Sequence, residues 1–307
     1  SFRHIAEYNG GFLYCMRHLL KRDEGMIEEF LYRNKRNYKN SGVINYMADQ
    51  DGLTMMDMVS YDERHNEANG ENGRDGIEYN CSWNCGAEGY SRKKSIRRLR
   101  MGQLKNAFLM LLLSQGTPLI FQGDEFGNSQ GGNNNAWCQD NETGWVNWKK
   151  LRQNKELFEF VQETVSIRKM HSILHLESEL KGADYKAVGY PDISYHSNQP
   201  WYYSGSPQYR HIGILYCEEY AGCEKELLFA AYNFHWNEHE FGLPSLSEKM
   251  SWEQILTSGE DAEIETEILK EEKTEKNKKK KEIQRKKVTI KVGPRTVVIL
   301  KGKQDEN

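Results

Sequence analysis

The sequence lacks any apolar run long enough to cross a lipid bilayer. The longest one, Ala107 to Leu113, is far shorter than the roughly 20 residues that a membrane-spanning helix needs. The first residues also lack a basic segment followed by an apolar core, so we expect no secretory signal. These absences predict a cytoplasmic protein with no membrane partner.

An excess of charge of either sign is also missing. The 307 residues carry 42 Lys and Arg against 45 Asp and Glu, which gives a formal net charge of -3. A molecule with so balanced a charge has no general attraction to nucleic acid or to an anionic membrane surface. We therefore predict no nucleic-acid partner.

Cysteine is too sparse for a disulfide framework. Its six positions do not form a regular set of pairs, and reduced thiols are expected in such a chain. A zinc site would need two closely spaced pairs of Cys or His, and Cys81 with Cys85 is a single pair, so we predict no metal site. Phosphate-cradle and redox motifs are also missing, which predicts no cofactor. The cysteines are at positions 15, 81, 85, 138, 217 and 223.

The first half of the chain alternates buried strands, polar loops and helices. Val43 to Ala48 and Thr117 to Gln122 are short apolar runs of the kind that form buried parallel strands. Residues 62–94 are polar and rich in glycine, which predicts a long loop, and loops of this length often carry function. A helix is predicted for Ser95 to Gln115, which Gly116 ends, and another for Leu151 to His171, where apolar residues recur at helical spacing. This order of elements is typical of a parallel α/β fold.

A different pattern begins near Gly182. Short segments rich in Tyr, Val, Ile and Phe are separated by Gly and Pro, as in Ile212 to Tyr216 and Leu227 to Asn233. Such segments predict antiparallel strands. We therefore divide the chain into two predicted domains, residues 1–178 and 179–307.

A charged tract, residues 260–287, interrupts the second predicted domain. It is acidic first and becomes strongly basic from Lys276 to Lys287. A basic run can indicate nucleic-acid binding, but this one lacks the interleaved aromatic residues that single-stranded nucleic-acid grooves use. We interpret the tract as a solvated hairpin or a mobile insertion, whose acidic half offsets its basic half.

The most informative segment follows the second predicted strand. Asp124 and Glu125 come directly after the strand, and a run of amides and acids with one tryptophan, Trp137, follows them. Carboxylates and amides hydrogen-bond hydroxyl groups, and an indole ring offers a flat apolar face. Because sugars present both kinds of surface, this segment, residues 124–140, which we call the amide loop, is suited to binding a carbohydrate. From composition alone, a polar loop built only for turning fits equally well.

Several further motifs occur in order around the amide loop. With them, the chain resembles the isoamylase and glycogen-debranching (pullulanase-like) branch of the α-amylase superfamily, glycoside hydrolase family 13, most densely from about Glu7 to Trp148. The further motifs are Asp51 to Tyr61, His65 to Glu71, Arg74 to Gly76, Cys81 to Gly86 and Asn147 to Trp148.

The resemblance implies a fold of two parts and a reaction. The first part would be the C-terminal part of a (β/α)8 TIM barrel, and the second an antiparallel β-sandwich domain. The implied reaction is retaining hydrolysis at α-1,6 branch points of glycogen-like α-glucans. In this family an Asp that follows a His at the end of a late barrel strand stabilises the transition state. Asp51 stands at the Asp position, but Gln50 stands at the His position and cannot carry its charge.

The two other catalytic carboxylates of the family lie upstream of the segment that Glu7 to Met26 resembles. No other Asp and Glu stand here in matching motifs, so the resemblance implies that the nucleophile and the acid/base are absent from this chain. A partial barrel also leaves strand edges that favour association. We therefore expect the N-terminal half of the same enzyme, or self-association, to complete it. The alternative function is a catalytically inactive glucan-binding or assembly module.

The candidate glucan-binding residues lie in the long loop and the amide loop. A polar cluster in a long loop can equally be structural, and a tryptophan in such a loop is often simply packed. Asp124 and Glu125 are interpreted as loop supports or as substrate contacts, and Arg74 and Asp75 as an ion pair that holds the long loop. The candidates are His65, Asn66, Glu67 and Asn69 in the long loop, and Asp124, Glu125, Asn135, Trp137 and Asp140 in the amide loop.

Overall fold

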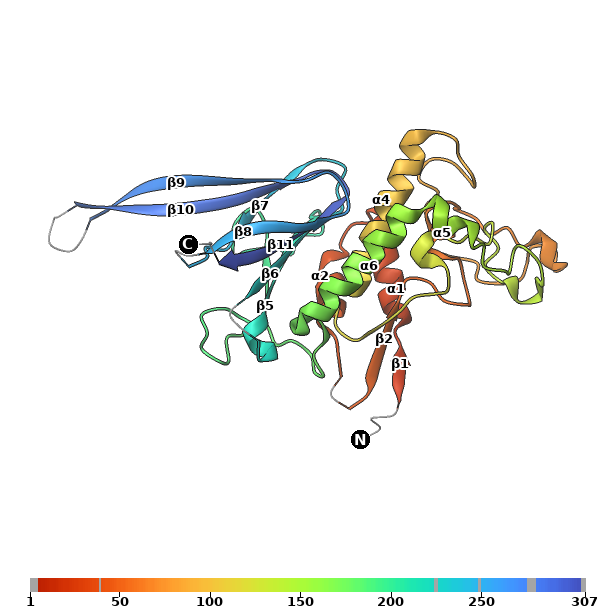
Figure 1. The fold of residues 1–307 in the computed structure, drawn as a ribbon, viewed down its shortest axis with the longest axis horizontal. Coiled ribbons are helices and arrows are strands. Elements are labelled where there is room, and N and C mark those ends of the chain that lie inside the picture. Colours follow the sequence, from red (N-terminus) through yellow and green to blue (C-terminus); the bar gives the residue numbers. More distant parts are fainter. Residues whose placement is uncertain (1–4, 39, 224–225, 248–249, 275–279, 305–307) are drawn as a thin grey trace. The chain divides into compact units, whose positions relative to one another are not determined.

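The chain folds into two compact units, Ser1–Leu180 and Lys181–Asn307, which we call unit 1 and unit 2 (Figure 1). Unit 1 combines helices with a parallel sheet, and unit 2 contains antiparallel sheets. The architecture is therefore mixed α/β with antiparallel sheets. The computed structural model describes residues 5–38, 40–223, 226–247, 250–274 and 280–304.

Strands and helices alternate along unit 1. Its longest helix, α4, follows the predicted long loop. In chain order the described elements are β1 (Ala6–Tyr8), α1 (Gly10–Lys21), α2 (Ile27–Lys35), β2 (Gly42–Tyr46), α3 (Met55–Met58), η1 (Glu67–Asn69), α4 (Lys94–Leu112), β3 (Thr117–Leu119), η2 (Asp124–Phe126), η3 (Ala136–Cys138), α5 (Lys149–Gln153), α6 (Lys155–Met170) and η4 (Ser172–His175).

The sheet of unit 1 has the order β1-β2-β3 and is parallel throughout. Ala6 pairs with Gly42, and Ile44 pairs with Thr117. Helices α1 and α2 connect β1 to β2, and the long loop with α4 connects β2 to β3. The parallel α/β order that the sequence predicts for this part of the chain is confirmed.

The predicted elements of unit 1 exist, but one of them is divided. The second predicted helix, Leu151 to His171, is interrupted at Asn154, whose φ of -116° and ψ of 38° are not helical. Asn154 Nδ2 donates to the carbonyl oxygen of Phe126 at 2.9 Å, and such side-chain bonds compete with a continuous helix. The strand predicted to reach Gln122 ends earlier, at Leu119.

The end of α4 fixes the start of β3. Arg168 on α6 donates to the carbonyl oxygens of Leu112 and Ser114 at 2.6 and 2.7 Å. Gly116 follows with a φ of +83°, and a Cβ atom there would lie 2.9 Å from the carbonyl oxygen of Val43 on β2. Only glycine tolerates both the conformation and the close approach.

Although α4 is apolar in its second half, none of the helices in the described ranges has the length and apolar character that crossing a membrane requires.

Unit 2 contains strands of varied length. The described elements are β4 (Ile193–His196), β5 (His211–Cys217), η5 (Glu218–Ala221), β6 (Leu227–Asn233), β7 (His239–Leu243), β8 (Met250–Thr257), β9 (Glu263–Thr274), β10 (Lys280–Val292) and β11 (Thr296–Gln304).

These strands form a five-stranded sheet, β4-β5-β6-β11-β8, and a three-stranded sheet, β7-β10-β9. Every residue of β5 and β6 is buried. The two sheets meet where the ring of His211 on β5 stacks on His239 of β7 at 4.1 Å and meets Phe241 of β7 edge-on at 5.6 Å. The prediction of antiparallel strands after Gly182 is confirmed.

The charged tract contributes the antiparallel pair β9 and β10. Their register runs from Glu263 opposite Lys291 to Thr274 opposite Lys280. Lys287, the last residue of the tract, stands opposite Glu267, and Lys291, just beyond the tract, forms an ion pair with Glu265. This pairing confirms the hairpin interpretation for the described residues. Residues 275–279, which include the start of the predicted basic run, lie outside them.

Candidate functional site

Two loops leave the sheet of unit 1 at the carboxyl ends of β2 and β3. The first begins with Asp49, Gln50 and Asp51, and the second is the amide loop. Because β2 and β3 are parallel neighbours, both loops start at the same edge of the sheet. This is the edge at which parallel α/β proteins place their binding residues.

Two buried carboxylates fasten these loops to each other. Asp57 accepts a bond from the backbone N–H of Gln130 at 2.7 Å and another from the hydroxyl of Ser129. Asp124 accepts a bond from the backbone N–H of Met55 at 2.9 Å. Burial raises the pKa of both carboxyl groups. Since Asp124 is only 1% exposed, it supports the loop from inside and does not stand at a surface that a ligand could reach.

The turn after β2 presents Gln50 and Asp51 to solvent. Both side chains are exposed, and the backbone N–H of Asp51 donates to Asp49 Oδ1 at 3.0 Å. The next residue, Gly52, faces the long loop, because a Cβ atom there would lie 3.8 Å from Cδ1 of Ile77. The exposed carboxylate of Asp51 therefore stands beside the long loop, where it can accept a bond from a ligand hydroxyl.

Asp75 lies at the centre of the contact between the long loop and the amide loop. Its Oδ2 accepts bonds from Asn69 Nδ2 at 2.7 Å and from Asn135 Nδ2 at 2.8 Å, with Asn66 Nδ2 further away at 3.4 Å. The bonds from Asn69 and Asn135 lower the pKa of the Asp75 carboxyl group. Among the described residues, amide groups and not the predicted partner Arg74 bind this carboxylate.

A second pair of amides joins the same two loops in the interior. Asn66 Nδ2 donates to Asn134 Oδ1 at 2.8 Å, and the backbone N–H of Asn134 donates back to Asn66 Oδ1 at 3.0 Å. Gly76 makes room for this pair with a φ of +74°, since a Cβ atom there would lie 2.2 Å from Asn134 Oδ1. Asn66 is fully buried, so the structure gives this candidate a structural position.

Removing the Asp75 carboxylate is expected to separate the two loops. In the variant Asp75→Ala, three amide groups lose the carboxylate that they share, so we expect limited proteolysis within residues 62–80 to become roughly tenfold faster, because local opening controls cleavage. Asp75→Asn keeps one acceptor oxygen and serves as the matched control. Equal cleavage rates in the wild-type chain and Asp75→Ala would contradict this role.

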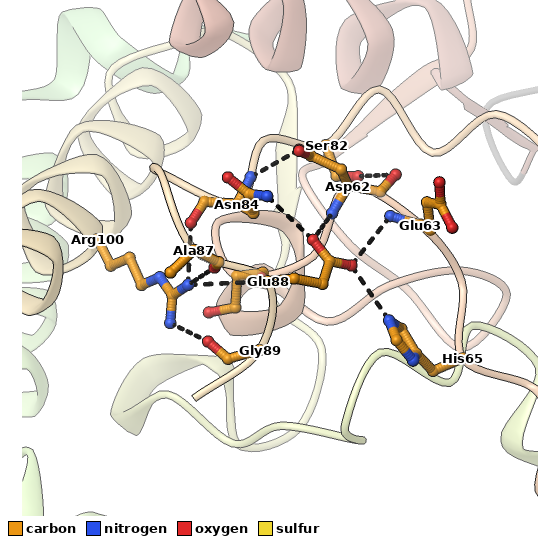
Figure 2. A network of polar contacts seen from close by, with 10 residues as sticks. Asp62, Glu63, His65, Ser82, Asn84, Ala87, Glu88, Gly89 and Arg100 are labelled. Carbon is orange, nitrogen blue, oxygen red and sulfur yellow. Dashed lines mark hydrogen bonds and ion pairs between the residues drawn. The ribbon is translucent and has the colours of Figure 1, made fainter. Parts of the chain in front are cut away.

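A carboxylate and a guanidinium group hold the remainder of the long loop (Figure 2). Glu88 accepts bonds from the backbone N–H of Asp62 at 2.9 Å and from His65 Nε2 at 3.1 Å. Partial burial would raise the pKa of Glu88, but its hydrogen-bond donors outweigh that effect and lower it. Arg100 on α4 donates to the carbonyl oxygen of Gly89 at 2.6 Å. The loop is therefore fixed both to itself and to a helix.

His65 connects the Glu88 network to the amide loop. Its backbone N–H donates to the carbonyl oxygen of Gly132 at 2.8 Å, and its ring meets Tyr61 edge-on at 5.0 Å. The side chain nevertheless remains 42% exposed. This candidate is thus held in one orientation while part of its ring stays accessible to a ligand.

The side chains of the remaining candidates differ in their exposure to solvent. Trp137 is 68% exposed, so the interpretation of a packed tryptophan is wrong. Asp140 accepts a bond from Trp145 Nε1 at 3.0 Å and so braces the loop. Glu67 is exposed. Glu125 lines an open depression of about 510 Å³ beside α6, apart from the amide contacts.

Arg17 on α1, which the sequence did not indicate, holds the turn after β2 and the long loop. Its buried guanidinium group donates to the carbonyl oxygens of Met47 at 2.6 Å, Asn80 at 2.7 Å and Leu53 at 3.2 Å. Nothing in the local sequence distinguishes it from a basic residue on a solvated helix face. The same holds for Glu88 and the other loop supports, since their roles depend on contacts distant in sequence. The other missed supports are Asp57, Arg100 and Asn134.

The chain is similar to several known proteins over much of its length. Isoamylase SU1, chloroplastic, of Zea mays is 32% identical over 266 residues, which cover 84% of this chain and 32% of that protein. The glycogen operon protein GlgX homolog of Mycobacterium tuberculosis (strain ATCC 25618 / H37Rv) is 39% identical over 185 residues, 58% of this chain and 26% of that protein. No family model matches. The chain thus spans about a quarter to a third of the length of these curated relatives.

A solved structure has a similar fold. The apo pullulanase from Paenibacillus barengoltzii matches 98% of this chain and 38% of its own, with a TM-score of 0.61 and 15% identity. At this identity the likeness concerns the fold alone. It extends over both units.

Proposed function

This chain is a homologue of the GlgX, isoamylase and pullulanase-type debranching enzymes of glycoside hydrolase family 13, and from this premise we propose that it is the C-terminal part of such an enzyme. Its substrate would be glycogen, amylopectin or a limit dextrin, and its target the α-1,6 branch point. The observation that carries the proposal is the contact between the long loop and the amide loop at the carboxyl edge of the sheet, where Asp51 and Trp137 are exposed. Carboxylates and an open indole ring suit the hydroxyls and the flat faces of glucose.

In this proposal residues 1–178 are the last part of a (β/α)8 barrel, and residues 179–307 are the C-terminal antiparallel β domain. The parallel order β1-β2-β3, with helices between the strands, supports this division. Among the described residues, β1 and β3 each pair on one edge only. Because unpaired edges favour association, the N-terminal half of the enzyme, or a second copy of the chain, would complete the barrel. The six free thiols fit a reducing compartment such as the cytoplasm.

Asp51 would be the transition-state-stabilising carboxylate, with Gln50 in place of the family histidine. The nucleophile and the acid/base would come from outside this chain, since retaining hydrolysis needs two carboxyl groups about 5 Å apart across the scissile bond. The exposed and partly exposed residues at the loop contact would bind the sugar, and the loop supports would hold the loops in place. The first group is His65, Glu67, Asn69, Asn135 and Trp137, and the second is the buried Asn66 and Asp124 together with the exposed Asp140; Glu125 remains a candidate contact on the α6 side.

Gln50 favours a second candidate function, a catalytically inactive glucan-binding or assembly module. A neutral amide cannot supply the charge-assisted contact that an imidazolium makes with a substrate hydroxyl. Both functions predict glucan binding. They differ in activity once the barrel is complete.

Glycogen binding can be measured by native electrophoresis of the 307-residue chain in gels containing glycogen. We expect glycogen to retard the wild-type chain and Trp137→Ala to raise the apparent Kd roughly three- to tenfold, because an exposed aromatic face is lost. Trp148→Ala is the matched control, since this Trp is equally exposed, at 69%, but its ring lies 5.7 Å from Phe126. Unchanged mobility of the wild-type chain would contradict the proposed function.

An assay for linear chains released from a branched glucan tests the missing carboxylates. We expect no release by this chain alone. Release would show that the chain contains a complete catalytic set, and would contradict the assignment of the nucleophile and the acid/base to another polypeptide segment.

A further inference from the structure

Unit 2 holds an exposed tryptophan in a conformation that tryptophan rarely adopts. Trp201 has a φ of +68°, in the left-handed region where a Cβ atom is strained. Its side chain is nevertheless 49% exposed, so burial of the ring does not account for the strained backbone. Strained conformations that the surrounding structure enforces are often found at binding sites.

A buried histidine enforces this conformation. The backbone N–H of Trp201 donates to Nδ1 of His196 at 2.8 Å, and His196 is fully buried at the end of β4. Because Nδ1 accepts this bond, the ring proton is on Nε2, which lies 3.0 Å from the hydroxyl of Ser194. The imidazole ring also meets the indole ring of Trp201 edge-on at 5.0 Å. The buried imidazole of His196 thus packs against the indole of Trp201 from the interior of unit 2.

Trp201 has an aromatic neighbour and adjacent amides. The ring of Tyr190 lies 6.0 Å away at an interplanar angle of 31°, so the two rings are tilted only moderately from a common plane. The hydroxyl of Tyr190 is fixed by a bond to the carbonyl oxygen of Ser245 at 3.2 Å. Asn198 and Gln199, just before Trp201 in the same turn, are exposed.

The turn is also anchored to the second sheet of unit 2. The backbone N–H of Gly242 on β7 donates to the carbonyl oxygen of Ser197 at 2.9 Å. A Cβ atom on Gly242 would lie 2.6 Å from Cδ of Pro200, so the turn lies directly against β7. A rigid aromatic surface with adjacent amide groups loses little conformational entropy when a ligand binds.

We propose that Trp201, Tyr190, Asn198 and Gln199 form a second α-glucan-binding site, on unit 2 and separate from the loops of unit 1. This inference rests on the proposed function for the identity of its ligand. The aromatic rings would contact the flat faces of neighbouring glucosyl units, and the amides would bind their hydroxyls. Two sites on one chain would increase the apparent affinity for a long polymer through a high effective concentration.

Electrophoresis in glycogen gels, with maltoheptaose as a soluble competitor, tests this site. Trp201→Gly removes the ring and also relieves the backbone, since glycine adopts a positive φ without strain. We expect its apparent Kd for glycogen to rise roughly three- to tenfold while its Tm is not lowered. Trp201→Phe, which keeps an aromatic face, should lie between Trp201→Gly and the wild-type chain.

Trp236→Ala is the matched control within unit 2. Trp236 is 48% exposed, but its ring already stacks on His235 at 4.0 Å, and Arg210 lies over it at 5.3 Å. Its replacement should leave the apparent Kd unchanged. If glycogen retards the wild-type chain and Trp201→Gly equally, the second site is refuted and the proposed function stands. If glycogen does not retard the wild-type chain, the proposed function fails first.

Discussion

Replacing Arg17 with methionine is expected to lower the free energy of unfolding of unit 1 by about 3 kcal/mol or more. The variant leaves the carbonyl oxygens of Met47, Leu53 and Asn80 without their donor, and each buried unsatisfied acceptor costs roughly 1–3 kcal/mol. Urea denaturation followed by hydrogen exchange in peptides from α1 and β2 would report this loss separately from unit 2.

The matched control for Arg17 is Arg97→Met. Arg97 is exposed on α4, and exposed substitutions usually change stability by less than about 0.5 kcal/mol. A loss in Arg17→Met no greater than in Arg97→Met would refute the role of Arg17. Since Met47 and Leu53 flank Gln50 and Asp51, we also expect Arg17→Met to bind glycogen more weakly under conditions where it remains folded.

Lowering the pH from 6.5 to 4.5 is expected to reduce the free energy of unfolding of unit 2. His196 and His211 should each account for a loss of about 2–3 kcal/mol. Burial lowers the pKa of His196 to about 3. Burial and then the neighbouring His239 and His235 lower the pKa of His211 to about 4. In the unfolded chain both rings take up a proton below about pH 6.5. The stability that the two neutral rings contribute is therefore complete above about pH 6.5. It is lost as the pH falls toward 4 for His211 and toward 3 for His196.

Hydrogen exchange of peptides from β5 and β6 at the two pH values would measure this loss. His196→Asn keeps an acceptor for the N–H of Trp201, and His211→Phe keeps a ring beside Phe241. Each variant should lose about 2–3 kcal/mol less stability on acidification than the wild-type chain. His175→Gln, at an exposed position in unit 1, is the control. The same pH dependence in the wild-type chain and both variants would contradict the prediction.

Much of the fold of unit 1 could be predicted, because its signals are local. The apolar run that forms β2 and the periodic apolar residues of α6 are recognisable within a few residues of sequence. The interruption at Asn154 was not predictable, since its cause is a bond to Phe126, which is 28 positions earlier. Contacts between segments distant in sequence leave no periodic pattern.

The exposure of the candidate side chains could not be predicted from the sequence. The amide loop and the long loop contact each other through Asn66, Asn134 and Asp75, which only the folded chain reveals. Asn66 and Asn69 are close in sequence, yet Asn66 is fully buried and Asn69 is only partly buried. Trp137 and Asp124 likewise have opposite exposures, 68% and 1%. Composition cannot distinguish a polar group that binds a ligand from one that supports a loop.

Residue types and their order along the chain were sufficient for the strands, the helices, the change to antiparallel structure and the resemblance to debranching enzymes, because each depends on neighbours in sequence. Packing was required for the rest. It buried Arg17, Asp57 and Asp124 against distant backbone groups, and it forced Trp201 into a strained but exposed conformation. Hydrogen bonds between remote segments have no counterpart in local composition, so only the folded chain specifies which polar groups support the loops and which remain accessible to a ligand.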